Sequence, residues 1–284
     1  MAIKICLDAG HYGKYNQSPA VKTYYESDMN WKLHLLLKAE LESYGIEVIT
    51  TRSNKDVDLG LLDRGKKSKG CDLFISIHSN AVGSNVNESV DYPVVYVPIS
   101  GKANAIGEKL ADCVTKVMGT KQKGYAKQRK GSGDWDYYSV IHGAVSVGVA
   151  GIIIEHSFHT NTRATNWLLD DSNLAKMAKA EAEVIAAHYG LQKQKEEPAV
   201  KPAETVSTPK NIALRTLQKG AKGEDVMALQ ILLRGRGCNG NMYQVLDGIF
   251  GNNTLGAVKL FQKREGLEVD GIVGVLTWSK LLGV

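Results

Sequence analysis

Three segments of the sequence place histidines and carboxylates at the ends of apolar runs. The segment Asp8–His11 (DAGH) closes the first such run, Ser76–Asn80 (SIHSN) closes the third, and Ile152–His156 (IIIEH) closes the last. Nearly continuous apolar runs are typical of strands that are buried on both faces. Because ligands of open α/β sheets bind at the carboxyl ends of the strands, we expect these side chains to share one rim of a sheet.

Two histidines and a carboxylate form a ligand set suited to a catalytic zinc ion, because they leave a fourth position for water. Glu26 lies at the start of the first predicted helix and can reach the same rim. A further carboxylate beside that water can accept its proton during attack on a carbonyl group. The alternative interpretation is a row of buried polar residues that satisfy one another along the rim, and the spacing alone does not decide between the two.

The elements that position these residues alternate between strands and helices over the first 190 or so residues. The predicted strands are Ile3–Leu7, Ile46–Thr51, Asp72–Ile77, Val94–Val97 and Gly151–Glu155. The predicted helices are Ser27–Tyr44, Leu59–Ser68, Ala103–Met118 and Asn173–Tyr189. Such alternation indicates an α/β fold, a mostly parallel sheet covered by helices on both sides.

The motifs at these positions resemble those of the zinc-dependent N-acetylmuramoyl-L-alanine amidases, the type 3 amidase family. The resemblance covers about residues 2 to 190 and rests on Asp8–His11, Glu26, Thr51-Arg52, Leu62–Arg64, Ser76–Ala81 and Ile152–Glu155. It implies a twisted six-stranded sheet with surrounding helices and one zinc ion. By the match, His11, Glu26 and His78 are the zinc ligands, and Glu155 is the general base.

The resemblance implies a peptidoglycan hydrolase that cleaves the amide between N-acetylmuramic acid and L-alanine of the stem peptide. The zinc chemistry would equally suit a carboxypeptidase or endopeptidase acting on stem peptides. A third hypothesis is a wall-anchoring protein without activity. The sequence argues against it, because all four family positions carry residues that can perform the metal-binding and catalytic roles.

Other polar residues near these motifs have more than one interpretation. Asn80 shares a side with His78 if the strand continues, and there it could bind a peptide carbonyl of the substrate or stabilise a turn. His142 and His159 are candidates to approach the site. His156 alternates with Glu155 and so should point to the opposite face of a continuing strand.

The chain of 284 residues is long enough for about two domains. The segment 192–211 carries three of the six prolines and almost no large apolar residue, which predicts a flexible linker. We therefore expect a catalytic domain at residues 1–191 and a second domain at residues 212–284.

The second domain contains a repeat, because the pattern D-G-x-x-G-x-x-T at Asp247–Thr254 recurs at Asp270–Thr277. Each copy predicts a glycine-rich turn that leads into a helix, and Glu224–Arg234 is also amphipathic, so three short helices are expected. The region from about Leu214 to Val284 resembles the three-helix peptidoglycan-binding domain of many wall hydrolases. This resemblance implies binding to bacterial peptidoglycan without catalysis.

Composition limits the remaining function classes. The net charge of +5 is too small for the basic stripe of a nucleic-acid-binding protein. The four cysteines are widely spaced, which predicts neither a disulfide framework nor a thiolate zinc site. No apolar run approaches the length of a membrane helix. The first residues lack a signal-peptide pattern, so we expect synthesis in the cytoplasm and action on the cell wall, by a phage or prophage endolysin rather than an exported autolysin.

Overall fold

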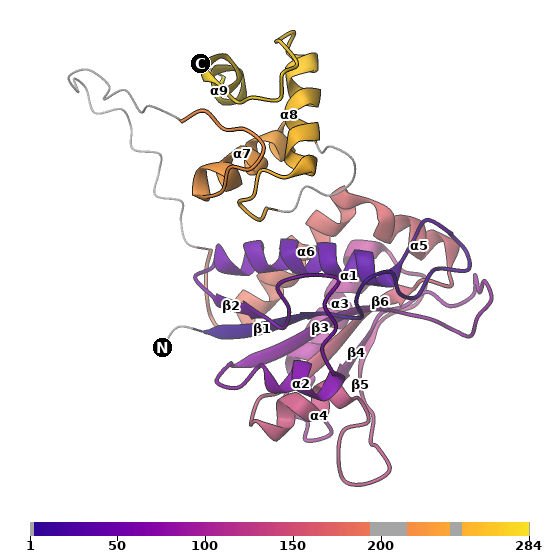
Figure 1. Ribbon diagram of the computed structural model, residues 1–284. Helices are drawn as coiled ribbons and strands as arrows, with labels where there is room; N and C mark the ends of the chain where they lie inside the picture. Colours follow the sequence, from indigo (N-terminus) through magenta and orange to yellow (C-terminus); the bar gives the residue numbers. More distant parts are fainter. Residues whose placement is uncertain (1–2, 194–214, 239–245, 284) are drawn as a thin grey trace. The chain divides into compact units, whose positions relative to one another are not determined.

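The computed structural model describes residues 3–193, 215–238 and 246–283 of the chain (Figure 1). The chain divides into two compact units, Met1–Ala199 and Val200–Val284, and each is described here by itself. Nearly all of the predicted linker at 192–211 lies outside the described residues. Within the described residues, no helix is both long and apolar enough to cross a membrane.

The large unit contains a six-stranded sheet with the strand order β2-β1-β3-β6-β4-β5. Its strands are β1 (Lys4–Ala9), β2 (Glu47–Thr50), β3 (Leu73–Asn80), β4 (Val94–Val97), β5 (Tyr125–Gln128) and β6 (Gly151–Phe158). The first four strands of this order are parallel, and β4 runs antiparallel to β6. This mostly parallel sheet confirms the predicted α/β class and its six strands.

Helices cover both faces of the sheet (Figure 1). They are α1 (Glu26–Glu42), α2 (Leu61–Lys66), α3 (Asn104–Met118), α4 (Ser139–Ser146), α5 (Thr162–Leu169) and α6 (Asp171–His188). One core forms where α1, α3 and α6 pack on Ile75, Ile77 and Ile154, and a second where α4 packs on Phe74 and Ile153. Because side chains alternate along a strand, β1, β3, β4 and β6 contribute buried residues to both cores.

Two strands extend further than the sequence predicts. β3 continues to Asn80 and β6 continues to Phe158, so that His78 lies within a paired strand and not in the loop after it, and Glu155 lies inside β6 and not at its end. The reason is that backbone pairing between β3 and β6 persists past the apolar residues, up to the pair Asn80 and Phe158. The rim at which the polar side chains gather is therefore formed by strands and has little conformational freedom.

The small unit consists of α7 (Glu224–Gly235), α8 (Asn252–Arg264) and α9 (Val275–Leu282) around one core. Phe250, Phe261 and Trp278 are among its buried residues. These helices confirm the predicted all-α architecture of the C-terminal region.

The sequence repeat corresponds to a repeated hydrogen-bonding unit. The side-chain amide of Gln230 donates to Asp247, to the carbonyl of Ile249 and to Thr254, and its carbonyl accepts the N–H of Gly248. The second copy repeats every one of these bonds around Gln262, with Asp270, Ile272, Thr277 and Gly271 as the partners. Each buried glutamine thus ties a helix to the turn that follows it.

Candidate metal and catalytic site

His11 follows the end of β1 in a left-handed backbone conformation with φ +60°, which is uncommon for a residue with a side chain. Two buried guanidinium groups hold this turn. Arg64 donates to the backbone carbonyls of Ala9 at 3.2 Å and His11 at 3.3 Å, and Arg52 also donates to Ala9. The arginines of the Thr51-Arg52 and Leu62–Arg64 motifs therefore fix the direction in which His11 leaves the sheet.

His78 and Glu155 are direct neighbours across the parallel strands β3 and β6. His78 lies two residues after Ser76, and Glu155 lies two residues after Ile153. Both side chains therefore point to the same face of the sheet, which α4 covers closer to the start of these strands. Gly10 allows the His78 ring to approach β1, because a Cβ atom at this position would lie 2.2 Å from His78 Cε1. The position of the ring thus depends on the absence of a side chain at Gly10.

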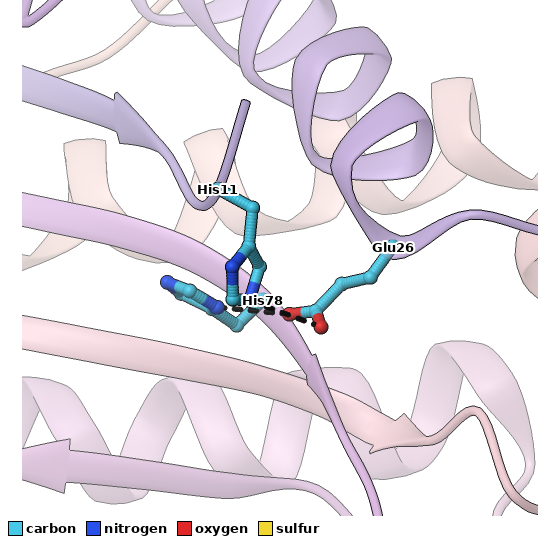
Figure 2. Close-up of side chains that lie close together, drawn as sticks. All are labelled: His11, Glu26 and His78. Carbon is cyan, nitrogen blue, oxygen red and sulfur yellow. Dashed lines mark hydrogen bonds and ion pairs between the residues drawn. The ribbon is translucent and has the colours of Figure 1, made fainter. Parts of the chain in front are cut away.

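Glu26 is the first residue of α1, and its carboxylate joins the two histidines (Figure 2). His78 Nδ1 lies 2.8 Å from Oε1, and His11 Nε2 lies 3.2 Å from Oε2. Burial opposes ionisation of this carboxyl, but the hydrogen bonds and charges of His11 and His78 outweigh that effect and hold the pKa of Glu26 well below its usual value. Glu26 is therefore ionised and available as an anionic ligand.

The three residues fit a metal ion. One ligand atom from each of His11, Glu26 and His78 lies within 4.8 Å of the others. Two imidazole nitrogens and one carboxylate match the ligand set of a catalytic zinc with an open fourth position.

Glu155 adds a second carboxylate to this site. Its Oε2 atom is shielded from solvent and has no hydrogen-bond partner among the described residues. Burial, and then the neighbouring charge of Glu26, raise the pKa of Glu155 well above its usual value. A shielded carboxylate oxygen without a donor is the group that a bound cation or an attacking water would satisfy.

A family model described as "N-acetylmuramoyl-L-alanine amidase" matches residues 5–187, a range that includes His11, Glu26, His78 and Glu155. The chain belongs to this family. A second model, described as "Putative peptidoglycan binding domain", matches residues 222–281 in the small unit. Both resemblances predicted from the sequence are thus confirmed.

Individual relatives match different lengths of this amidase-family chain. An endolysin of Bacillus phage SPP1 is 30% identical over 198 residues, which cover 68% of this chain and 69% of the endolysin. A spore cortex-lytic enzyme of Bacillus subtilis is 41% identical over 80 residues, 28% of this chain and 24% of that enzyme. The chain therefore spans about a quarter of the length of the spore cortex-lytic enzymes that it matches.

Among solved structures, an N-acetylmuramoyl-L-alanine amidase from Clostridium difficile 630 superimposes with a TM-score of 0.57. The sequences are 17% identical, and the match covers 66% of this chain and 97% of that structure. At this identity the likeness establishes the shared fold.

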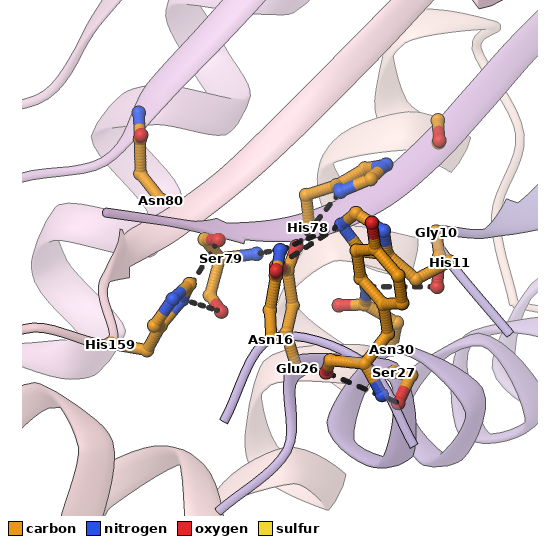
Figure 3. Close-up of polar contacts among 12 residues, drawn as sticks. Gly10, His11, Asn16, Glu26, Ser27, Asn30, His78, Ser79, Asn80 and His159 are labelled. Atoms are coloured by element: carbon orange, nitrogen blue, oxygen red, sulfur yellow. Dashed lines mark hydrogen bonds and ion pairs between the residues drawn. The ribbon is translucent and has the colours of Figure 1, made fainter. Parts of the chain in front are cut away.

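Asn80 of this amidase-family member lies apart from the group around Glu26 (Figure 3). The register shift between the pairs His78–Glu155 and Asn80–Phe158 places the extra residue on β6, so β3 itself stays regular from His78 to Asn80. Its side-chain oxygen accepts the N–H of Ala81 at 2.8 Å, and its backbone carbonyl accepts the N–H of His159 at 2.8 Å. The structure thus gives Asn80 a turn-forming contact, and a role in substrate binding stays a prediction.

The other histidines take separate positions. His156 points away from Glu155 and contacts Glu181 on α6, as expected for a continuing strand. His159 approaches the site indirectly, because its Nδ1 atom contacts Ser79, whose backbone N–H donates to Glu26 at 3.1 Å. His142 lies on α4, with 6.4 Å between its ring centroid and that of Trp135.

Two residues of the site escaped the sequence analysis. Asn16 donates from its side chain to Glu26 Oε2 at 2.6 Å and lies 3.2 Å from His11 Nε2. Ser79 donates to the other oxygen of Glu26 from its backbone, which no sequence pattern can reveal. The polar, proline-containing stretch before Glu26 signals a loop, but only the folded chain brings Asn16 onto the carboxylate (Figure 3).

Proposed function

We propose that this protein hydrolyses the amide bond between N-acetylmuramic acid and L-alanine of the peptidoglycan stem peptide. His11, Glu26 and His78 would hold one zinc ion, and Glu155 would act as the general base. The observation that carries this proposal is the pairing of His78 with Glu155 across β3 and β6, beside the carboxylate of Glu26. Membership of the amidase family supports the choice of bond.

A zinc ion held by His11, Glu26 and His78 would supply Lewis-acid chemistry, which polarises the carbonyl of the scissile amide and lowers the pKa of a bound water molecule. Glu26 supplies the single negative charge of the ligand set, so the loaded site keeps a net positive charge that suits an oxyanion. Gly10, Arg52 and Arg64 act on this site only through the positions of His78 and His11.

Glu155 performs the proton transfers in this proposal. As a carboxylate beside the three candidate metal ligands, it can accept the proton of the attacking water. The same carboxyl group then donates this proton to the leaving amine of L-alanine, because the breaking C–N bond needs a proton on nitrogen. The unpartnered Oε2 atom is free to make both contacts.

The wall polymer would be both the substrate and the binding partner, which places the site of action outside the cytoplasmic membrane. The match of the small unit to a peptidoglycan-binding model supports attachment to the same polymer. Similarity to a phage endolysin over two thirds of the chain supports the role of a lysin rather than an autolysin.

The experiment is mass spectrometry of purified peptidoglycan after digestion, with and without a chelator. An amidase releases intact stem peptides with a free alanine amino group, whereas a carboxypeptidase releases a single terminal residue. We expect the amidase products, their loss in chelator, and their return on addition of zinc. Full activity of a protein shown by elemental analysis to contain no zinc would refute the metal assignment. Release of single residues would favour the peptidase instead.

A further inference from the structure

The two copies of the repeat in the small unit have the same backbone but differ at two exposed positions. Gly251 precedes α8 with φ −86° and ψ −167°, and Gly274 precedes α9 with φ −90° and ψ −170°. The two residues that follow are Asn252-Asn253 in the first copy and Val275-Leu276 in the second. The turns around them share their hydrogen bonds, so this exchange of amides for aliphatic side chains is not required by the fold.

Val275 and Leu276 are the two most exposed large hydrophobic side chains in the described part of the chain. Their exposed fractions are 78% and 73%, and the next value is 57%, for Leu61. Exposed apolar area costs about 25 cal/mol per Å² relative to burial, and asparagines in the first copy show that polar residues suit the same positions. An apolar pair at this place therefore indicates a surface that a ligand covers.

Leu276 also lines an open pocket of about 440 Å³ in the small unit. The charged residues around this pocket are Arg236, Lys280 and Glu265, and Leu267 adds a second aliphatic side chain. The pocket thus combines two cations, one anion and an apolar wall. A separate, smaller pocket of about 150 Å³ lies at the turn of the first copy, and Asn252 and Asn253 are among the residues that line it.

We propose that Val275, Leu276 and the adjacent pocket bind the stem peptide of peptidoglycan. This proposal rests on the proposed function, which is action on the cell wall. It assigns the contact of the small unit to the peptide part of the wall polymer. The aliphatic side chains receive the methyl groups of alanine residues, and Arg236 and Lys280 receive the peptide carboxylates. Glu265 faces the amino groups that stem peptides also carry.

The chemistry of the pocket favours the peptide over the glycan. Sugar rings are neutral and bind best against flat aromatic side chains, and among the described residues that line the pocket none is aromatic. Trp278, the tryptophan of α9, is buried in the core with 5% of its surface exposed. Charges of both signs beside aliphatic side chains suit a peptide that carries carboxylates, amines and methyl groups.

The test compares the full chain with the double variant Val275→Asn/Leu276→Asn, which gives the second copy the residues of the first. Each protein carries Glu155→Gln to prevent digestion and is sedimented with purified walls over a range of concentrations. The matched control is Ile231→Gln on α7, which removes an aliphatic side chain of 53% exposure that does not line the pocket. Thermal unfolding checks that every variant is folded.

We expect the double variant to bind walls about tenfold more weakly or worse, the loss expected for two buried aliphatic contacts, and the control to bind normally. Lys280→Glu should also weaken binding and reduce its dependence on salt. A soluble stem peptide should displace the protein with the unaltered Val275 and Leu276 from the walls, whereas an N-acetylglucosamine oligomer should not.

Equal wall binding by the double variant and the control would overturn the proposal, as would displacement by the sugar oligomer alone. The rate of cleavage of a soluble muropeptide, measured with Glu155 restored, distinguishes this failure from that of the proposed function. If cleavage is normal but wall binding does not change on substitution of Val275 and Leu276, only the proposed binding site is wrong. If cleavage is absent but wall binding does depend on these two residues, only the proposed amidase activity is wrong.

Discussion

Asn16 holds Glu26 at two points, through the backbone and through the side chain (Figure 3). Its carbonyl accepts the N–H of Glu26 at 3.0 Å, and its amide donates to Glu26 Oε2 at 2.6 Å. Asn16 has φ +52°, a left-handed conformation that asparagine adopts more readily than most residues. Since Ser79 donates to Oε1, each oxygen of the carboxylate has a fixed donor besides the histidines, and the plane of the carboxylate is set before a metal binds.

Replacement of Asn16 by alanine should weaken zinc binding. The loss of a donor that orients a ligand typically lowers metal affinity by about ten- to a hundredfold. Competition with a chromophoric chelator measures this affinity directly, without reference to activity. Gln17→Ala is the matched control, because Gln17 donates to Lys22 and Tyr25 and makes no contact with Glu26 in the structure. Unchanged zinc affinity in a folded Asn16→Ala protein would show that Glu26 needs no such support.

Replacement of Glu155 by glutamine should separate chemistry from metal binding. The amide keeps the size of the side chain but cannot accept a proton, so amidase activity should fall by about a hundredfold or more. Zinc content and wall binding should stay at the level of the unaltered protein. Glu183→Gln, an exposed residue of α6, is the control. Loss of zinc together with activity would make Glu155 a ligand and contradict the assigned roles.

The same variant should stabilise the metal-free protein at neutral pH. Because the pKa of Glu155 is raised on folding, the folded state retains a proton that the unfolded chain releases above about pH 4.3. Stability therefore falls as the pH rises from that value through the raised pKa, by at most about 1.4 kcal/mol per pH unit for one proton. Unfolding curves with and without Glu155→Gln should converge at low pH. Parallel curves at every pH would show that folding does not raise the pKa of Glu155.

The strands that carry the site were predictable, and the edge strand β5 was not. Apolar runs identify β1, β3 and β6 because these strands are buried on both faces. β5 has the sequence Tyr-Ala-Lys-Gln and lies at the sheet edge with mostly exposed residues, so it has no apolar run to detect. The helix α4 is short and rich in residues that also suit a strand, and α5 depends on the cap at Asn161.

The three candidate metal ligands could be proposed from the sequence, and the structure brings their side chains together, because each lies near the end of a regular element. Their surroundings could not, because these depend on contacts between distant parts of the chain. Asp8 illustrates the limit, since a buried carboxylate three residues before His11 suggests a partner for an imidazole. In the structure it accepts hydrogen bonds from Thr51 at 2.6 Å and Ser76 at 2.8 Å and so joins three strand ends.

A buried ion pair supports the strand behind His78. His156 Nδ1 lies 2.9 Å from the carbonyl of His78, and Nε2 lies 2.8 Å from Glu181 Oε1. The backbone carbonyl accepts a hydrogen bond from Nδ1, and the carboxyl group of Glu181 favours a second proton on Nε2. Burial opposes this charge, but Glu181 outweighs the penalty and raises the pKa of His156. The stabilisation is complete below the unfolded pKa of about 6.5 and is lost as the pH rises through the raised value.

Glu181→Gln should destabilise the large unit by about 3 kcal/mol, because it leaves the buried imidazole without its counter-charge. The effect should be largest near pH 6 and smaller at high pH, where His156 is neutral in both proteins. Urea unfolding at the two pH values measures it, with Glu183→Gln on the same helix as the control. An equal loss of stability at both pH values would mean that packing, and not charge, accounts for the contribution of Glu181.

The glycines of the repeat give the small unit a separate test of its turn geometry. Gly248 has φ +66° and Gly271 has φ +78°, a region that β-branched residues adopt only at a cost. A Cβ atom at Gly271 would also lie 2.4 Å from Leu255 Cδ1, and one at Gly248 would lie 3.0 Å from the carbonyl oxygen of Gly223. Both turns donate their glycine N–H to a buried glutamine, so a displaced turn also leaves that side chain unpaired.

Replacement of both Gly248 and Gly271 by valine should therefore unfold the small unit and abolish wall binding, since strain and lost hydrogen bonds each cost about 1–3 kcal/mol. Zinc content and cleavage of soluble muropeptides should be unaffected, because the large unit has its own core and carries the proposed site. Gly256→Ala is the control, because this glycine lies within α8 with open space around it, where alanine favours the helix. Helical signal and wall sedimentation measure the small unit, and chelator competition measures the large one. If the double valine variant lost zinc as well, the two units would depend on one another for folding, contrary to their separate cores.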